Sequence, residues 1–420
     1  MLPRTMLNLQ GRAFYQLMSF SCAMAFLIFG YDAGVLGGVQ TTQPFLSGLN
    51  ITGNEQGNLI IPLIASSYTL GCLVMAIFLV ISGVGYHFGR RMSILIGDVL
   101  VVIGGAIQAS SFSVAQIITA RVICGFGIGL ISATVPTYMS ETTIKTSQRG
   151  PQVAIQCVYL IWGVALAYWV DLGMTQLDSQ ASWRFPISLQ SLFTLLSFVG
   201  MLVLPDTPRW YYSKGRIEDG DRVLSQLYAL PIEDEQVQKT RAEILETIKL
   251  EDQEGRIKVL DFFWDRSKLQ SARRVRTSFL ILSLQQNMAI GCWMGCPWLY
   301  GPEIAPLRYR HLGGAAGIVG EWSMTFATVF GGGIAVQSVG WPIWFWQLTS
   351  CVVAVIFVYF WCPETAGKTL EEIDDVFIEE AQRWPGAKHI RVHEEELSVE
   401  DSRSGKGAKY EEVAEHEETV

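Results

Sequence analysis

Residues 14–39 read FYQLMSFSCAMAFLIFGYDAGVLGGV, and Asp32 is the only Asp, Glu, Lys or Arg among them. In a bilayer, where no water can pair with the backbone, about 20 apolar residues of helix span the hydrocarbon core. This stretch therefore predicts a helix that crosses a membrane. Arg4 and Arg12 precede it and no convincing cleavage site accompanies it, so we expect a retained first span and not a signal peptide.

Similar apolar runs recur along the chain, but they are distributed unevenly. Of the 420 residues, 50% are hydrophobic and 17% are charged. The further runs lie at 58–82, 92–110, 115–138, 152–172, 184–204, 278–300, 314–337 and 342–362. The sequence thus predicts an all-α membrane protein with a complete six-helix bundle in residues 1–204. Only three more apolar segments follow, in residues 277–362, so the second bundle is expected to be incomplete.

Two charged segments separate and follow these runs. Residues 205–276 mix apolar positions with Glu, Lys and Gln at helical spacing, as in 222–230 and 235–250. This pattern predicts a linker of short helices lying under the bundles. Residues 363–420 form an acidic tail that supplies much of the net charge of -8, and we expect this tail to be cytoplasmic and partly disordered.

The basic residues indicate which side of the membrane these loops face. Arg90 and Arg91 lie between the second and third spans and Arg209 follows the sixth, whereas residues 40–57 contain no Lys or Arg. Because basic loops stay inside, we expect the N-terminus and the linker in the cytoplasm. The triplet Asn50-Ile51-Thr52 matches an N-glycosylation sequon in the loop expected outside. These features predict the orientation of a multi-pass membrane protein, which we expect in the plasma membrane.

The sequence lacks the residue patterns of several other classes of protein. It has no nucleophile–base set, no phosphate-binding loop and no metal-ligating cluster, so we expect neither an enzyme nor a bound cofactor or metal. It also has no basic patch interleaved with aromatic residues, which argues against a nucleic-acid partner. The eight cysteines show neither disulfide nor zinc spacing and are expected to be small core residues.

Two charges inside the predicted spans need a physical explanation. Asp32 lies deep in the first span and Arg121 opens the fourth. An ionised carboxylate in mid-membrane costs about 2.5–3.5 kcal/mol on insertion scales, so it should face a partner or a water-filled cavity. We expect the two side chains to pair. The pair is either a proton-binding site, in which moving the arginine lets the acid take a proton, or a static contact that positions two helices. Glycines beside both residues predict close helix packing.

Several short strings together resemble one family. The matching strings are GYDAGVLGG (30–38), GRR (89–91), RVICGFGIGL (121–130), PTYMSE (136–141), RG (149–150), LPDTPRW (204–210), QQ (285–286), PWLYGPEIAPLRYR (297–310) and CPETAGKTLEEID (362–374). In this order they are similar to sugar porters of the major facilitator superfamily, especially the fungal ones. The resemblance implies two six-helix bundles joined by a cytoplasmic linker. It also implies a sugar site between the bundles that is exposed to each side in turn.

The resemblance implies roles for individual residues. Asp32 and Arg121 match the pair that couples proton movement to sugar in symporting members, so symport is expected over uniport. Charged residues at the cytoplasmic side are implied to latch the outward-facing state. They are Arg90, Arg91, Glu141, Arg149 and Arg209 in the first half and Glu303, Arg310, Glu364 and Lys368 in the second. The alternative is that these charges only set the topology of the loops.

The candidate sugar-binding residues combine amides with aromatic rings, which is the chemistry that a sugar needs. They are Gln156, Gln285, Gln286, Trp298 and Trp322. Trp298 matches the tryptophan of the family's tenth helix. The alternative for each tryptophan is a core residue or a residue at the membrane interface.

Three single positions depart from the family pattern. Tyr86 stands where the loop before GRR normally has an acid, so one latch contact is expected to be weaker. Cys157 stands where the fifth helix carries a sugar-binding glutamine, and Gln156 points about 100° away from that position on a helix. Glu321 replaces the asparagine before Trp322 and adds a second carboxylate to apolar sequence, where it is a candidate for titration.

The largest departure follows Gln285 and Gln286. From about Met288 the chain passes directly into the sequence of the family's tenth helix, so helices eight and nine are missing. If residues 278–300 cross the membrane once, Arg310 lies outside, against the positive-inside rule. If the segment dips in and returns, its basic flanks stay inside, but a re-entrant segment needs protein around it. We therefore expect a strained or displaced segment, in a chain of about nine apolar segments instead of twelve.

Two hypotheses on function follow. The first is a proton-coupled carrier of a hexose or small oligosaccharide, monomeric, with sugar, protons and the lipid bilayer as its partners. The second is a shortened, transport-inactive or sensor-like protein of the same family, able to associate with an intact carrier. The short tail has no signalling motif of the kind that sensors carry, which favours the first hypothesis.

Overall fold

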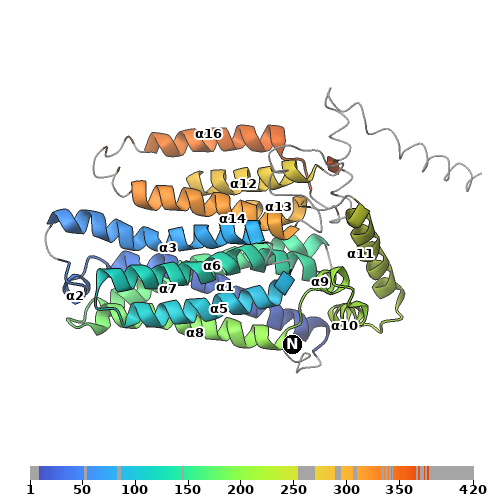
Figure 1. Ribbon diagram of the computed structural model, residues 1–420, viewed down its shortest axis with the longest axis horizontal. Helices are drawn as coiled ribbons and strands as arrows, with labels where there is room; N and C mark the ends of the chain where they lie inside the picture. The colour runs from blue at the N-terminus through green and yellow to red at the C-terminus, as the bar shows by residue number, and fades with distance from the viewer. Residues whose placement is uncertain are drawn as a thin grey trace, which may run out of the picture.

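The computed structural model describes residues 9–51, 54–82, 87–143, 146–253, 270–288, 295–305, 310–332 and 344–365, with residues 335, 339, 342, 368, 373, 376 and 377. The regular elements among these residues are helices, as the all-α prediction requires. The long helices lie side by side along one direction, with α9, α10 and α11 at one end of them and the short α2 at the other (Figure 1).

Among the described residues of the first half, six helices are long and apolar enough to cross a membrane. They are α1 (Gly11–Val39), α3 (Asn54–Ser82), α5 (Arg90–Ala109), α6 (Val114–Thr142), α7 (Thr146–Met174) and α8 (Ala181–Val203). The six predicted spans of the first bundle are confirmed, although several helices extend beyond their predicted bounds. A short helix, α2 (Gln43–Gly48), lies between α1 and α3, and Asn50 follows it with an exposed side chain.

Glycines allow the backbones of this bundle to touch. A Cβ atom on Gly30 of α1 would overlap the backbone oxygen of Leu160 on α7. A Cβ atom on Gly125 of α6 would likewise overlap the backbone oxygen of Tyr68 on α3. The close packing predicted for the glycine-rich strings is therefore present, and it holds α1 and α3 at fixed depths against their neighbours.

The described part of the linker forms three helices at the end of the bundle where α1 begins (Figure 1). They are α9 (Pro208–Ser213), α10 (Ile217–Tyr228) and α11 (Glu235–Gln253). The Tyr212 hydroxyl donates to Asp221 at 2.7 Å, and the Nε atom of Arg241 lies 3.2 Å from the same carboxylate. Asp221 of α10 thus contacts one residue of α9 and one residue of α11, and these contacts tie the linker helices together.

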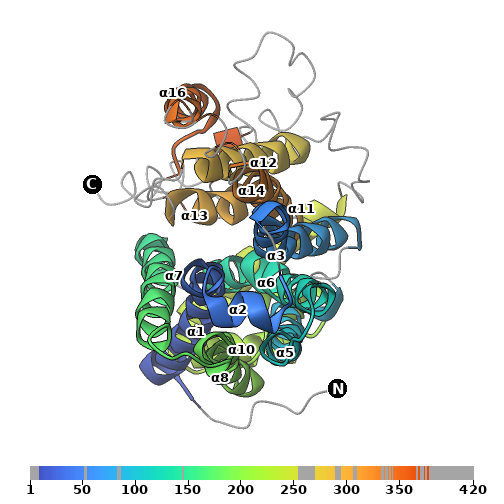
Figure 2. The same ribbon diagram turned by 90° about the vertical axis from the view of Figure 1, so that its left-hand side faces the viewer.

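The second half contains fewer long helices and lies on one side of the six-helix bundle (Figure 2). Its elements are α12 (Ser271–Met288), α13 (Gly295–Ile304), α14 (Arg310–Phe326), the π-helical turn η4 (Ala327–Gly331) and α16 (Trp344–Trp361). α14 packs against α3 and α6 of the first half, and α13 packs against α7. α12 begins inside the range predicted for the linker.

The apolar segment predicted over residues 278–300 is not one crossing helix. α12 ends at Met288 and α13 begins at Gly295. The Ser278 hydroxyl, near the middle of α12, donates to the carbonyl of Gly313 on α14 at 2.8 Å. The same hydroxyl lies 2.5 Å from the place that an added Cβ atom would take on Gly301, near the end of α13. The chain therefore enters and returns, so both flanks of the segment lie at the same end of the molecule.

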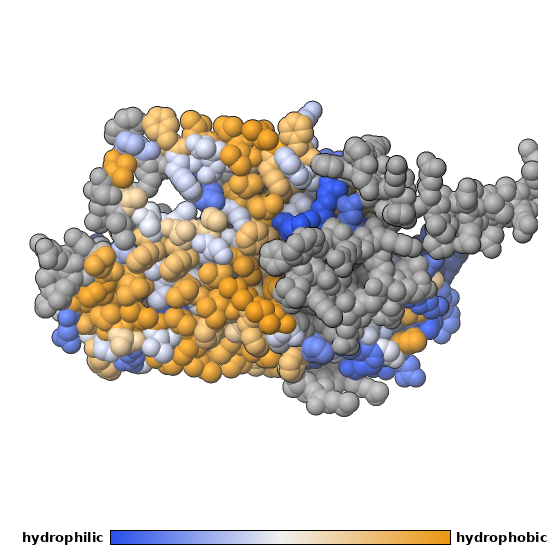
Figure 3. All heavy atoms as spheres, turned by 45° about the horizontal axis from the view of Figure 1, so that its top comes forward, coloured by the Kyte–Doolittle hydropathy of each residue, from blue (hydrophilic) through white to orange (hydrophobic). Residues whose placement is uncertain are grey.

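Much of the surface of α16 is not covered by the described part of the chain. This helix packs against α12, and apolar side chains on several of its faces are exposed, up to 81% for Tyr359. Over the face drawn in Figure 3, apolar residues cover the flanks of the helices while strongly hydrophilic residues gather toward the ends. This distribution suits a protein surrounded by lipid, and the exposed α16 agrees with an incomplete second bundle.

Candidate functional site

Asp32 and Arg121 meet inside the first bundle. Asp32 on α1 is fully buried and Arg121 on α6 is nearly so. The Nη1 atom of Arg121 lies 3.6 Å from Oδ1 of Asp32 and donates to Oε1 of Gln108 on α5 at 3.4 Å. The guanidinium is thus shared between the carboxylate and an amide, and neither contact is short.

Other side chains complete the surroundings of this ion pair. The guanidinium carbon of Arg121 lies 5.0 Å from the ring centroid of Tyr68 on α3, within the range of a cation–π contact. The Cys124 thiol, one turn further along α6, lies 3.8 Å from Oδ2 of Asp32 and 3.9 Å from Oε1 of Gln190 on α8. Because the Asp32 carboxylate is buried beside the Arg121 guanidinium, a movement of Arg121 changes the free-energy cost of ionising Asp32.

An aromatic cluster joins the two halves close to this pair. The ring centroid of Trp298 on α13 lies 5.6 Å from that of Phe26 and 5.9 Å from that of Phe29, both on α1. The ring of Trp322 on α14 lies 5.3 Å from Phe29 and 5.6 Å from Tyr68. The two predicted tryptophans are therefore brought together at the interface between the halves, and Phe29 touches both.

Several buried polar groups in this region have no hydrogen-bonding partner among the described residues. They are both amide atoms of Gln156 on α7, Oε1 of Gln285 on α12, Nε1 of Trp298 and Oε2 of Glu321 on α14. Each of these side chains is 5% exposed or less, while Gln286 is half-buried. Leaving a buried polar group unpaired costs about 1–3 kcal/mol, so these donors and acceptors are suited to binding a polar molecule.

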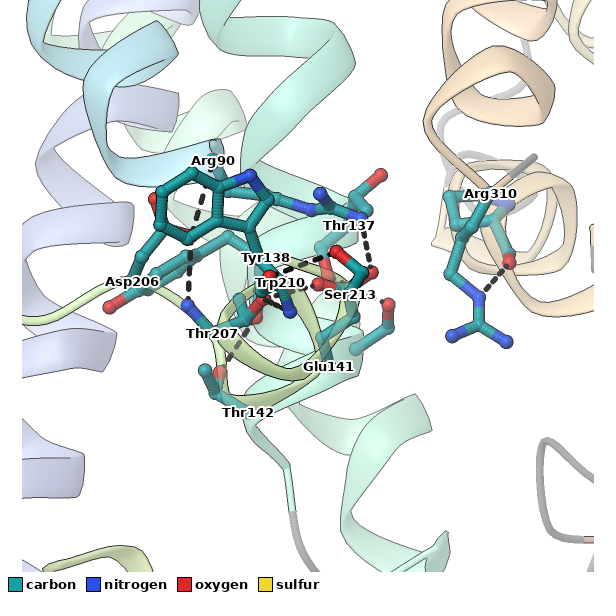
Figure 4. A network of polar contacts seen from close by, with 12 residues as sticks. Arg90, Thr137, Tyr138, Glu141, Thr142, Asp206, Thr207, Trp210, Ser213 and Arg310 are labelled. Atoms are coloured by element: carbon teal, nitrogen blue, oxygen red, sulfur yellow. Dashed lines mark hydrogen bonds and ion pairs between the residues drawn. The ribbon is translucent and has the colours of Figure 1, made fainter. Parts of the chain in front are cut away.

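A second polar cluster lies at the end of the bundle next to the linker (Figure 4). The Nη2 atom of Arg90 lies 2.8 Å from Oε1 of Glu141, and the Thr207 hydroxyl donates to Oε2 of the same carboxylate at 2.7 Å. The Nε atom of Arg91 donates to the backbone oxygen of Met201 at 2.9 Å. Three of the predicted network residues are therefore placed in one buried cluster that ties α5, α6 and α8 to the linker.

Asp206 caps the N-terminus of α5. Its carboxylate oxygens accept hydrogen bonds from the backbone amides of Arg90 and Arg91, each at 3.1 Å. The first amides of a helix lack partners within it, so an acceptor at this place stabilises the helix. Gly89 precedes the helix with a left-handed φ of 87°, and a Cβ there would overlap the carboxylate. Burial raises the pKa of Asp206 to about 6, although Arg90 and three backbone amides, including that of Thr207, lower it.

Arg310 faces this cluster from the second half. It begins α14, and its Nε atom donates to the backbone oxygen of Pro302 at 3.0 Å. Figure 4 shows Arg310 across the interface from Glu141, and the charges of Arg310 and Arg209 both act on that carboxylate. Predicted residues of the two halves thus face each other at this end of the molecule.

The structure describes the remaining predicted network residues in less detail. Glu303 on α13 is half-buried, Glu364 follows α16 and is exposed, and Lys368 is half-buried. Arg149 belongs to the first turn of α7, but its side chain lies outside the described part of the chain, as does the whole of Tyr86. The part of the network that the structure describes in detail is centred on Glu141.

Comparison with known families identifies the class of protein that has this arrangement. The family described as "Sugar (and other) transporter" matches residues 18–291 and 287–377 of the chain. The chain belongs to this family. The two matched stretches of this sugar transporter overlap at residues 287–291, where the sequence predicts a junction near Met288.

Named relatives agree with the family. This sugar transporter is 26% identical to the MFS-type transporter oryC of Aspergillus oryzae, over 85% of this chain and 84% of the relative. It is 24% identical to the Sugar transporter STL1 of Saccharomyces cerevisiae, over 91% and 85%. Its fold is similar to that of the proton:xylose symporter XylE bound to 6-bromo-6-deoxy-D-glucose, with a TM-score of 0.68, 19% identity and coverage of 87% and 99%. The protein is therefore a multi-pass membrane protein of the major facilitator fold and not an enzyme.

Sequence reasoning missed several residues of this transporter's site. Phe26 and Phe29 lie on α1 at helical spacing before Asp32, so the position of the acid could have pointed to them. Tyr68 on α3 and Ser132 on α6 belong to no motif that the sequence analysis used, and their contacts with the second half depend on how the halves pack. No local signal in the sequence predicts those contacts.

Proposed function

We propose that this sugar transporter carries a hexose or small oligosaccharide across the plasma membrane together with protons. The observation that carries the proposal is the position of the Asp32–Arg121 pair. Phe29 lies one turn before Asp32 on α1 and contacts both Trp298 and Trp322. A sugar that moves these rings therefore acts on the helix that holds the acid.

The chemistry of the interface supports a polyhydroxylated ligand. The unpaired amides of Gln156 and Gln285 and the indole nitrogen of Trp298 offer the donors and acceptors that sugar hydroxyls need, beside aromatic faces that stack on sugar rings. Relatives named as a sugar transporter and a high-affinity glucose transporter support the same class of substrate. The fold neighbour named as a proton:xylose symporter supports coupling to protons.

The arrangement of charges supports alternating access. The buried Arg90–Glu141 pair belongs to the first half and Arg310 belongs to the second, so rocking of the halves changes the distance between them. In this proposal the linker and the N-terminus face the cytoplasm, and the return of the chain after α12 places the flanks of that segment there too. The transporter works as a monomer.

A second candidate is a transport-inactive or sensor-like protein of the same family. Two observations favour it: the exposed apolar faces of α16 and the two-part family match that meets at residues 287–291. The chain is also 29% identical, over 68% of its length, to the High glucose sensor RGT2 of Saccharomyces cerevisiae. In this case the missing block between α12 and α13 leaves a protein that pairs with an intact carrier.

Radiolabelled uptake in cells that lack their own sugar carriers separates the two candidates. Labelled D-glucose and D-xylose are supplied in acidic and in neutral medium, and the first candidate predicts accumulation that is stronger in acid. Asp32→Asn should abolish accumulation and leave exchange of labelled for unlabelled sugar, because the amide keeps the shape of the site but cannot take a proton.

Asp98→Asn is the matched control for this substitution. Asp98 is a second fully buried aspartate of the first bundle, on α5, and accepts a hydrogen bond from Ser197 at 3.1 Å. It should keep the uptake of the unmodified protein. An unchanged pH dependence in Asp32→Asn contradicts proton coupling, and a correctly inserted chain that takes up neither sugar supports the second candidate.

A further inference from the structure

Tyr68 touches both parts of the candidate site. It lies on α3 and is 2% exposed. The guanidinium of Arg121 lies 5.0 Å from the centroid of its ring, and the ring of Trp322 lies 5.6 Å from it at an interplanar angle of 88°. A single aromatic side chain of the first half therefore connects the buried ion pair with a tryptophan of the second half.

The groups on both sides of this ring are themselves held in place. The backbone of Tyr68 is pressed against Gly125 of α6, where even a Cβ atom would overlap its carbonyl oxygen. The indole nitrogen of Trp322 donates to the Ser132 hydroxyl on α6 at 3.3 Å. Because its backbone is fixed, the Tyr68 ring can respond to Arg121 only by rotating, and such a rotation changes its perpendicular contact with Trp322.

We propose that Tyr68 is a positioning residue that transmits the protonation state of Asp32 to Trp322, and thereby to the proposed sugar site. The inference rests on the proposed function. When Asp32 is ionised, it draws Arg121 toward the carboxylate and away from the ring face. When Asp32 takes a proton, the guanidinium is released to the ring of Tyr68 and to Gln108, and the ring settles in a different position against Trp322. If protonation of Asp32 changes the affinity for a sugar that binds against Trp322, then by linkage binding of that sugar changes the proton affinity of Asp32 by the same factor.

In the part of the chain that the structure describes, few other titratable groups face Asp32 from the helices packed around it. α6 contributes Arg121 and Cys124, and α3 contributes Tyr68 and Cys72. Tyr31 on α1 precedes Asp32, and its hydroxyl donates to the backbone oxygen of Pro186 at 2.9 Å. α5 and α8 contribute the uncharged amides of Gln108 and Gln190. Among these groups Arg121 is the cation, so a change at Asp32 acts first on the guanidinium that also faces Tyr68.

Two substitutions of Tyr68 separate the ring from the hydroxyl. Tyr68→Phe keeps the aromatic face that meets Arg121, and Tyr68→Leu removes it. The control is Ile64→Ala, one turn earlier on α3 and equally buried, which removes packing volume without touching the pair or Trp322. The readout is the pH midpoint of labelled D-glucose and D-xylose uptake.

We expect Tyr68→Phe and Ile64→Ala to keep the midpoint of the unmodified protein. In Tyr68→Leu, Arg121 loses the attraction of the ring and lies closer to Asp32, so more acid is needed to protonate the carboxylate. A cation–π contact of ordinary strength corresponds to a shift of about half a pH unit to one unit toward acid. A midpoint in Tyr68→Leu that matches Ile64→Ala overturns the inference.

A second readout does not depend on transport. The protein carries Glu321→Gln, so that the carboxylate next to Trp322 cannot titrate, and is labelled with 5-fluorotryptophan in lipid nanodiscs; the ¹⁹F signal of Trp322 is assigned with Trp322→Phe. We expect this signal to shift with pH in this background and when Tyr68→Phe is added, and to lose that shift when Asp32→Asn or Tyr68→Leu is added. A signal that still titrates in Tyr68→Leu overturns the inference. A signal that behaves as expected in a protein without sugar uptake refutes the proposed function and leaves the transmission through Tyr68 intact.

Discussion

Removing Glu141 should destabilise the protein far more than removing a half-buried acid whose short ion pair is made with an exposed arginine. The Glu141 side chain is fully buried, and its two oxygens meet Arg90 at 2.8 Å and the Thr207 hydroxyl at 2.7 Å. Deleting one partner of a buried ion pair leaves the other charge uncompensated and costs about 3–5 kcal/mol. Asp219 pairs with Arg216 at 2.6 Å, but the arginine side chain is 49% exposed, and such pairs contribute less than about 1 kcal/mol.

The assay is thermal unfolding of the purified protein in detergent. For a bundle of this size we expect Glu141→Ala to lower the melting temperature by roughly 6 °C or more, and Asp219→Ala by no more than about 3 °C. The double variant Arg90→Met with Glu141→Leu removes both charges, so it should recover part of the loss caused by Glu141→Ala alone. Equal and small losses in Glu141→Ala and Asp219→Ala would refute the claim that the Arg90–Glu141 pair is desolvated.

Three other substitutions test separate parts of the structure. Gly30→Val should abolish correct insertion or uptake, because its side chain meets the backbone of Leu160, whereas Gly173→Ala, which has nothing within 4 Å of the added atom, should be silent in the same uptake assay. The pKa of Asp206, raised to about 6, means that the folded protein holds a proton that the unfolded chain releases near pH 4. The stabilisation that this bound proton gives the folded protein is therefore present below about pH 4 and is lost as the pH rises to about 6. Asp206→Asn should flatten the plot of melting temperature against pH in this range. Glu321→Gln should leave the melting temperature unchanged in acid and raise it in alkaline buffer, because ionising a buried carboxylate without a partner among the described residues costs about 2.5–3.5 kcal/mol; an equal effect at both pH values contradicts this.

The sequence predicted the features that depend on local composition. The six spans of the first bundle follow from long apolar runs, because lipid leaves an uncharged helix as the one stable local structure. The pairing of Asp32 with Arg121 followed from the same logic, since two charges in apolar sequence have few other ways to reduce their cost. Gly30 and Gly125 indicated close packing for a similar reason, and their neighbours are indeed backbone atoms.

The features that the sequence did not predict depend on how distant segments pack. Residues 278–300 have the length and hydropathy of one span, and hydropathy alone cannot distinguish a crossing from the return that α12 and α13 make. The contacts of Tyr68 and Phe29 with Trp322 arise only when the second half packs on the first. The cap that Asp206 provides to α5 joins residues 116 positions apart, so no local pattern could indicate it.

Coupling of sugar to protons is the claim on which the account depends, and reconstituted vesicles test it without other cellular carriers. The purified protein is placed in proteoliposomes that contain a pH-sensitive dye, and D-glucose or D-xylose is added outside with no pH gradient. We predict that the lumen acidifies as labelled sugar enters, and that Asp32→Asn abolishes the acidification. Sugar entry at the same rate with no change of internal pH would contradict the account.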